Sequence, residues 1–262
     1  MFYKTQVTIF SGDKLCGGTL IDPKHIVTSA KCINGFLEQF HIKTVPSMSV
    51  EVVASGDDHE VNTFRILSLN SNFKDDDFHP RSDAIGLLEL VKPVTNNINY
   101  SRTKLSEVDL ESLTDEEVLV LSSKNMSSGG IKGRRFVNTN LPMKIVSTEE
   151  CKEYNSLMSH VDDSLTLSCG ITKKQDYQLS KGDPVTQGDT LIGVVEEWAL
   201  GKPIIFTSIS KFIQLIQENK QNALSCDTPS CYKVNHIAGN KSLNCSDGED
   251  PDDGSRQCLV NL

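Results

Sequence analysis

The sequence lacks a long apolar run. None of its 262 residues belongs to a stretch that approaches the roughly 20 consecutive apolar residues of a membrane-spanning helix, so we expect no membrane insertion. The opening MFYKTQVTIF is too short and too mixed in character for a signal peptide. We therefore expect that any leader was removed ahead of these residues.

Basic charge and metal-binding patterns are also scarce. The 26 Lys and Arg residues are outnumbered by 35 Asp and Glu residues, which gives a net charge of −9. Because nucleic-acid binding needs a basic face, we expect no nucleic-acid partner. The six histidines show no metal-ligand spacing, and the acidic stretch Glu249–Asp253 lacks the spacing of a calcium loop. We expect neither a metal nor a cofactor.

Cysteine, in contrast, is abundant. Eight cysteines in a chain of this size indicate an oxidising compartment. Four N-x-S/T triplets are possible glycosylation sites, at Asn99, Asn125, Asn240 and Asn244. Both features are typical of a secreted, extracellular protein.

The first 222 residues read as β-rich. Many short apolar runs separated by turn residues favour a sandwich or a barrel. These runs are Val7–Phe10, Thr19–Ile21, His25–Val27, Ser49–Val53, Ile85–Leu90, Val118–Leu121, Lys144–Val146, Thr190–Val195 and Ile204–Ser208. One helix is predicted near the end of this region, because Ile209, Phe212, Ile213 and Ile216 form one apolar stripe.

Composition changes after about Asn222. Residues 223–262 contain four of the eight cysteines and almost no apolar periodicity. A segment this short buries too little apolar surface to fold unaided, so we expect a disulfide-tied acidic extension. Four cysteines allow three connectivities of two bridges.

Several segments in order along the chain match one family. Cys16–Ile21 and His25–Cys32 resemble CGG(S/T)LI and WVLTAAHC of the trypsin-like serine proteases. Further segments are similar to the family's DIALLKL, its two later cysteine segments, GDSGGP, G(I/V)VSW and KPGVYT. They are Ala84–Leu90, Ile145–Cys151 with Leu167–Cys169, Gly182–Pro184, Gly193–Trp198 and Lys202–Thr207.

The resemblance implies an all-β, chymotrypsin-like fold for residues 1–222. Two six-stranded antiparallel barrels are expected at about residues 1–105 and 106–206, followed by a helix at about 207–221. It further implies the bridges Cys16–Cys32 and Cys151–Cys169. The remaining cysteines would then pair among themselves in the extension; they are Cys226, Cys231, Cys245 and Cys258.

The resemblance also implies that the catalytic machinery is absent. Acyl transfer in this family needs a hydroxyl nucleophile, an imidazole base and an orienting carboxylate. Lys31 stands at the base position, and Pro184 stands where the nucleophile should be, without a hydroxyl or a backbone N–H. The carboxylate position falls on Ala84, because Asp83 is one residue early and would point to the opposite side of an extended strand.

Substrate recognition is predicted to be lost as well. Gln178 is expected near the base of the primary pocket, where a trypsin-like preference for basic residues needs an aspartate. Ala199 and Ile204 stand at family glycine positions and are expected to block the pocket. Asp183 matches the aspartate that pairs with the new N-terminus in active family members, and here it is expected to be exposed or paired differently.

These observations predict a pseudoprotease rather than an enzyme. Inactive members of the family act as cofactors, decoys or inhibitors in extracellular proteolytic or immune cascades, so we expect an extracellular protein partner and regard the extension as the first candidate for its binding site. Two alternatives stay open. One is a structural or storage component of a secretion, and the other is an enzyme that uses Lys31 with a nearby hydroxyl.

Overall fold

The computed structural model describes most of the barrels and parts of the extension. The described residues are 5–11, 14–33, 48–52, 57–69, 84–95, 103–125, 136–154, 166–221, 231–233, 244–249 and 256–259.

The first barrel is a closed antiparallel sheet. Its order is β5-β4-β1-β2-β3-β6, and β6 pairs back onto β5. The strands are β1 (Gln6–Ser11), β2 (Lys14–Leu20), β3 (His25–Ser29), β4 (Ser49–Val52), β5 (Asp57–Ser68) and β6 (Ala84–Leu90). Val7 and Ile9 alternate into the barrel interior, which the period-2 pattern of a strand requires.

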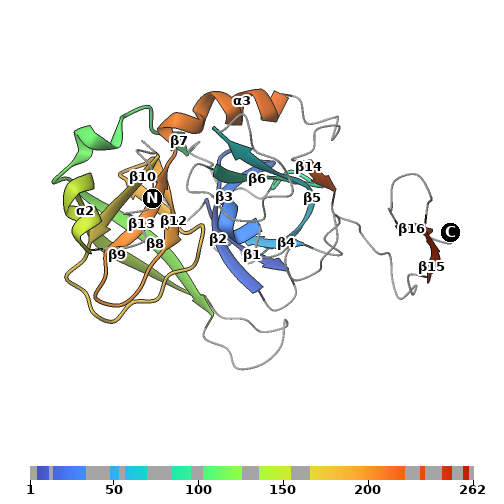
Figure 1. Ribbon diagram of the computed structural model, residues 1–262, viewed down its shortest axis with the longest axis horizontal. Coiled ribbons are helices and arrows are strands. Elements are labelled where there is room, and N and C mark those ends of the chain that lie inside the picture. The colour runs from blue at the N-terminus through green and yellow to red at the C-terminus, as the bar shows by residue number, and fades with distance from the viewer. Residues whose placement is uncertain are drawn as a thin grey trace.

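The second barrel closes in the same way. Its order is β11-β8-β9-β10-β13-β12, and β11 pairs with β12. The strands are β8 (Glu117–Asn125), β9 (Phe136–Val146), β10 (Leu167–Ile171), β11 (Pro184–Gln187), β12 (Thr190–Glu197) and β13 (Ile204–Ser208). The prediction of two six-stranded antiparallel barrels is confirmed, and Figure 1 shows them side by side.

A short strand, β7 (Lys104–Leu105), runs parallel to β12. Its hydrogen bonds belong to the second sheet, so that sheet begins at Lys104 rather than after residue 105.

Helical segments are few and short in the part of the chain that the structure describes. They are η2 (Leu110–Leu113), α2 (Thr148–Tyr154), η4 (Ser210–Phe212) and α3 (Ile213–Gln221). The C-terminal helix was predicted from about residue 207, but β13 continues to Ser208 and a 3-10 turn precedes α3. The sequence analysis missed α2, although Ser147 and Glu150 have capping-box spacing, and the Ser147 hydroxyl accepts the Glu150 N–H at 3.2 Å.

Each barrel has its own apolar core, and a third cluster joins them. Residues of the first barrel (Ile85 and Leu87) and of the second (Leu191 and Val194) are buried together with Phe212 of η4. The helix α3 lies across the top of the view in Figure 1 and covers this junction. The helix therefore helps to fix the barrels against each other.

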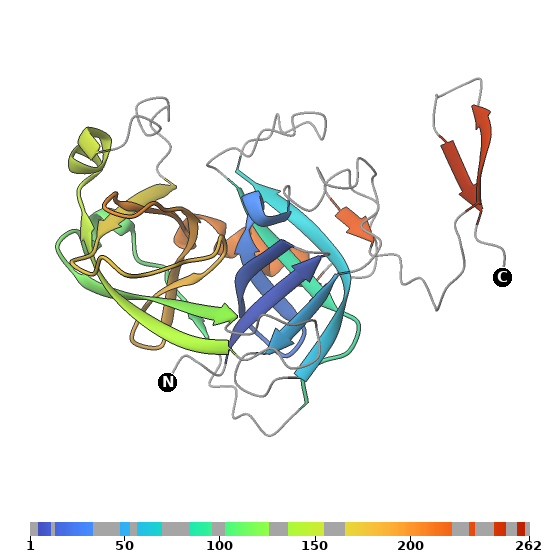
Figure 2. The same cartoon turned by 90° about the horizontal axis from the view of Figure 1, so that it is seen from below.

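The extension follows α3. Its strand β14 (Cys231–Lys233) pairs with Thr63–Arg65 of β5, so the extension is docked on the first barrel. Strands β15 (Asn244–Glu249) and β16 (Arg256–Leu259) form a separate antiparallel pair, which lies apart from the barrels in Figures 1 and 2.

Candidate functional site

The barrels meet through close backbone contacts. The Gly17 N–H donates to the Lys181 carbonyl at 2.8 Å, and the Thr28 hydroxyl donates to the Gly17 carbonyl at 2.7 Å. Gly182 lies against both groups with φ of +84°, and a Cβ there would be 2.2 Å from each oxygen. Only glycine accommodates both this conformation and this approach.

The resemblance assigns three positions to the triad. Lys31 follows β3, Ala84 begins β6 beside β3, and Pro184 begins β11. Pro184 pairs with Val194 of β12, two residues from Glu196, whose side chain reaches β3. Lys31 and Ala84 thus lie at or next to the ends of neighbouring strands of the first barrel, and Pro184 lies on the second barrel beside the strand that contacts β3.

Pro184 is buried within the β11–β12 ladder. Its ring carries no hydroxyl and its nitrogen carries no proton, so this position provides neither a nucleophile nor a hydrogen-bond donor.

Lys31 does not face a nucleophile. Its Nζ forms a 3.4 Å ion pair with Glu197 Oε2, while the Ser29 hydroxyl, two residues before it, donates to Glu196 Oε2 at 2.6 Å. Ser29 is also fully buried. A serine–lysine pair with Lys31 as base is therefore not formed with Ser29.

The position that the resemblance assigns to the orienting carboxylate has no carboxyl group. Ala84 is buried and offers only a methyl group. Asp83 lies outside the described residues. A carboxyl group of the second barrel does reach β3, on Glu196 of β12.

Glu196 is the residue that the sequence analysis missed. It is 2% exposed and accepts hydrogen bonds from Ser29 and, at 3.1 Å, from Thr207. Burial raises the pKa of Glu196 from its ordinary value of 4.5 to about 7, against the opposing effects of the Ser29 hydroxyl and the Lys31 charge. The signal was present in the sequence as two glutamates that end an otherwise apolar strand before Trp198.

Asp183 is a second buried carboxyl group in this region. It is 1% exposed, which corrects one of the two alternatives predicted for it. Its Oδ2 accepts the Ser180 N–H at 2.7 Å, while its Oδ1 has no hydrogen-bond partner. Burial raises the pKa of Asp183 to about 7, although the Ser180 N–H and the Ser122 hydroxyl act in the opposite direction.

The segment around Gln178, expected near the base of the primary pocket, alternates between buried and exposed residues. Gln178 is exposed, whereas Tyr177 and Leu179 on either side of it are buried. They share a cluster with the fully buried Ile204 and with Trp198, whose ring centroid is 5.8 Å from that of Tyr177. Tyr177 and Leu179 could have been found from the strict alternation of apolar and polar residues in this segment.

Ala199 also differs from a pocket-filling residue. It is exposed, and its carbonyl accepts a hydrogen bond from the Tyr177 hydroxyl at 3.3 Å. Of the two residues predicted to block the pocket, only Ile204 therefore lies in the buried cluster.

The disulfides implied for the barrels are present, Cys16–Cys32 in the first and Cys151–Cys169 in the second. In the extension, Cys245 and Cys258 are direct partners in the β15–β16 register. Two bridges among Cys226, Cys231, Cys245 and Cys258 stay a prediction with open connectivity, and Cys226 lies outside the described residues.

Two of the four possible glycosylation sites lie among the described residues, each at the end of a strand. Asn125 ends β8 and Asn244 begins β15. Asn99 and Asn240 lie outside the described residues.

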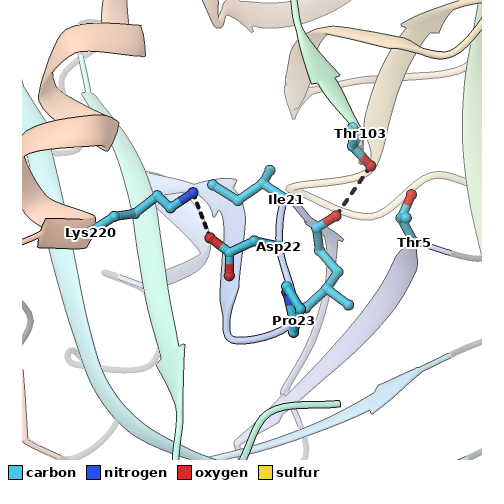
Figure 3. A pocket seen from close by; sticks show the side chains of 7 residues that line it. Thr5, Ile21, Asp22, Pro23, Thr103 and Lys220 are labelled. Carbon is cyan, nitrogen blue, oxygen red and sulfur yellow. Dashed lines mark hydrogen bonds and ion pairs between the residues drawn. The ribbon is translucent and has the colours of Figure 1, made fainter. Parts of the chain in front are cut away.

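A separate cavity of about 350 Å³ lies where α3 meets the first barrel. Lys220 of α3 reaches Asp22 at 2.5 Å, and Thr103 donates to the Leu20 carbonyl at 3.2 Å, as Figure 3 shows. Asp22 is also 2.9 Å from His25 Nδ1. Burial alone would raise the pKa of Asp22, but the hydrogen bonds from His25, Lys220 and the Lys24 N–H outweigh it and hold the pKa well below its usual value. The charges of this cavity are thus already paired, which favours a structural role.

Within the described ranges, no cluster of three or more His, Cys, Asp or Glu side chains is placed to hold a metal ion. Among the same residues, no helix has the length and apolar character to cross a membrane.

Two antiparallel barrels with a cleft between them define the architecture of the chymotrypsin-like serine proteases. A family model described as Trypsin matches residues 2–216. The chain therefore belongs to the trypsin family.

Similar proteins include trypsins, an inhibitor protein and an inactivated protease paralogue. The chain is 25% identical over 199 residues to a trypsin of Simulium vittatum, which covers 76% of each chain. It is 21% identical over 222 residues to glucanase inhibitor protein 3 of Phytophthora infestans, which covers 78% of each. The solved structure of the scabies mite inactivated protease paralogue S-D1 matches with a TM-score of 0.62 and 17% identity, and covers 85% of this chain and 94% of the other. At this identity the structural likeness shows the fold alone.

Proposed function

We propose that this chain is a secreted, non-catalytic serine protease homologue that acts by binding another extracellular protein, as a cofactor, decoy or inhibitor in a proteolytic or immune cascade. The observation that carries the proposal is Pro184, a buried proline in a strand, at the position that the resemblance assigns to the nucleophile. Without a hydroxyl there, the family's acyl-enzyme chemistry has no first step.

The other side chains of the cleft support the same conclusion. Lys31 is engaged by Glu197, and Ser29 is engaged by Glu196 and excluded from solvent. Both polar groups of the alternative lysine-dependent enzyme are therefore occupied. Two similar proteins are named a glucanase inhibitor and an inactivated protease paralogue, and these names fit a family member without catalytic activity.

Secretion is part of the proposal. Two disulfides close loops within the barrels, and such bonds persist in oxidising compartments.

Binding is best tested on a reconstituted extracellular protease cascade. Purified chain added in excess should change the rate of activation of one cascade protease, and binding to that protease should be saturable in a direct assay. A secretion component without a partner would leave every step of the cascade unchanged.

Variants can then locate the binding surface. Truncation after Lys233 removes β15 and β16 but keeps β14 on the barrel, so it tests the extension without exposing the β5 edge. The surface beside Trp198 is tested by Leu200→Ser, because Leu200 is 59% exposed and lies two residues after Trp198. Val108→Ser, at another exposed apolar residue, is the matched control. Loss of binding on truncation alone would assign recognition to the extension, and loss in Leu200→Ser alone would assign it to the surface around Leu200.

A further inference from the structure

The contact between the barrels contains two buried acids and little positive charge. Glu196 and Asp183 are 2% and 1% exposed. Both lie on the second barrel, and both touch the first: Glu196 through Ser29 of β3, and Asp183 through Gly17 of β2. Charged carboxylates in such a place require compensation, because removing one from water costs several kcal/mol.

The neighbours of Glu196 provide mostly neutral hydrogen bonds. Ser29 from β3 and Thr207 from β13 contribute hydroxyls, which can donate to a carboxylate or accept from a carboxylic acid. The charged groups that face it are Lys31 and the exposed Lys181, and Lys31 is paired with Glu197 instead. Among the described residues, no ion pair is formed to Glu196 itself.

The surroundings of Asp183 are more restrictive still. Among the described residues its hydrogen-bond donor is the Ser180 N–H, and the nearby Ser122 hydroxyl of β8 donates to the Gln178 carbonyl at 3.0 Å; both groups are neutral. A Cβ added to Gly17 would be 2.1 Å from Oδ1, so the backbone of β2 lies directly on this unpartnered oxygen. There is no room for water at that face unless β2 moves.

We propose that the contact between the two barrels is a proton-operated latch, in which Glu196 and Asp183 hold the barrels together as neutral carboxylic acids and loosen them on ionisation. An ionised acid gains hydration only when β2 and β3 move away from it. Lys31 and Glu197 stand on opposite barrels, so the loosened form presents a different cleft surface. The latch is a property of the chain itself and does not depend on the proposed function.

The direction follows from linkage. A group with a pKa raised in the closed form favours that form fully below its ordinary value, and the advantage disappears as pH rises through about 7. The latch is therefore tight near pH 5 and loose near pH 8. For Glu196 alone, the opening equilibrium constant rises by about tenfold or more across this interval.

Hydrogen exchange tests the latch directly. Protection factors, corrected for the intrinsic effect of pH, should fall by about tenfold or more from pH 5 to pH 8 in β2, β3 and β12. At pH 8 the opening free energies of these strands should also lie below that of β9, which pairs only with β8 and β10. Equal opening free energies in all four strands at pH 8 would overturn the latch, since exchange would then report global unfolding alone.

Isosteric variants assign the effect. Glu196→Gln and Asp183→Asn cannot ionise, so each should remove part of the pH dependence. Glu197→Gln is the matched control, because Glu197 is the adjacent acid and is 41% exposed, and it should retain the full dependence. An unchanged profile in both buried-acid variants would contradict the proposal.

A second measurement needs no variant. In the wild-type chain, the carboxyl ¹³C resonance of Glu196 should titrate near pH 7. Titration near 4.5, the ordinary value, would overturn the latch even if the variants fail to fold.

Discussion

Two buried polar contacts of this molecule shift the pKa values of their carboxyl groups in opposite directions. We call the contact of Asp22 with His25 and Lys220 the helix seam, and the contact of Glu196 and Asp183 with β2 and β3 the barrel seam. At the helix seam, Asp22 lies between His25 and Lys220, and its pKa is lowered. At the barrel seam, Glu196 and Asp183 receive hydrogen bonds from neutral donors, and their pKa values are raised to about 7. The difference shows that burial alone does not set the charge of an acid; the partners that accompany it into the interior do.

The largest loss of stability at the barrel seam is expected for a substitution at Gly182. Gly182→Ala should destabilise the fold by about 3–5 kcal/mol, because its Cβ would collide with the Gly17 carbonyl and the Thr28 hydroxyl in addition to the cost of a positive φ. Gly201→Ala is the control, with φ of +72° and no neighbour within 4 Å. It should cost only about 1–2 kcal/mol in the same chemical denaturation experiment. Equal losses in the two variants would show that the close contact is unimportant.

The two seams should give opposite slopes of stability against pH. Asp22 contributes stability above its ordinary pKa of 3.8 and loses it in acid, whereas Glu196 and Asp183 contribute below their ordinary values and lose it as pH rises through about 7. The free energy of unfolding should therefore peak near pH 4–5 and fall by on the order of 2 kcal/mol towards pH 8. Glu196→Gln should flatten the alkaline side. A wild-type maximum at pH 8 would contradict this description of the barrel seam.

The helix seam can be broken at its carboxylate. Asp22→Asn removes the charge that faces His25 and Lys220, and should cost about 1–3 kcal/mol in thermal or chemical unfolding. Asp115→Asn removes one side of an exposed pair with Lys144 at 2.6 Å and should cost less than about 0.5 kcal/mol. A larger loss at Asp115 would reverse the order that burial predicts.

The smallest effect is expected for the ion pair inside the cleft. Lys31 and Glu197 are 3.4 Å apart, with side chains 22% and 41% exposed. A double-mutant cycle with Lys31→Met and Glu197→Gln should give a coupling below about 0.5 kcal/mol. A coupling above about 2 kcal/mol would show that this pair, and not the buried acids, joins the barrel walls.

The fold could be predicted from the sequence because the family's motifs occur in order and carry their cysteines with them. Cys16 lies in β2 and Cys32 follows β3, and the structure places the bridge where the resemblance implies it. The helix stripe of Phe212 and Ile216 was also recognised, although β13 delayed its start to Ile213. Local pattern and family order agree in these segments, which is why the prediction was reliable there.

The site could be predicted only in part. The occupants of the triad positions are visible in the sequence, but the direction of a side chain depends on register. Gln178 was expected near the base of the primary pocket, and the strand-like alternation buries its neighbours Tyr177 and Leu179 and exposes Gln178 itself. Glu196 was hidden because a register shift between Val195 and Glu197 accommodates the second glutamate, and no spacing rule shows that the first one turns inward.

The most direct test of the central claim is reactivity towards a fluorophosphonate probe, with active trypsin labelled in parallel. Since the resemblance assigns Lys31 to the position of the base and Pro184 to that of the nucleophile, the purified chain should show no labelling and no turnover of peptide esters or amides. Stoichiometric labelling that maps to a serine of the folded chain would contradict the account.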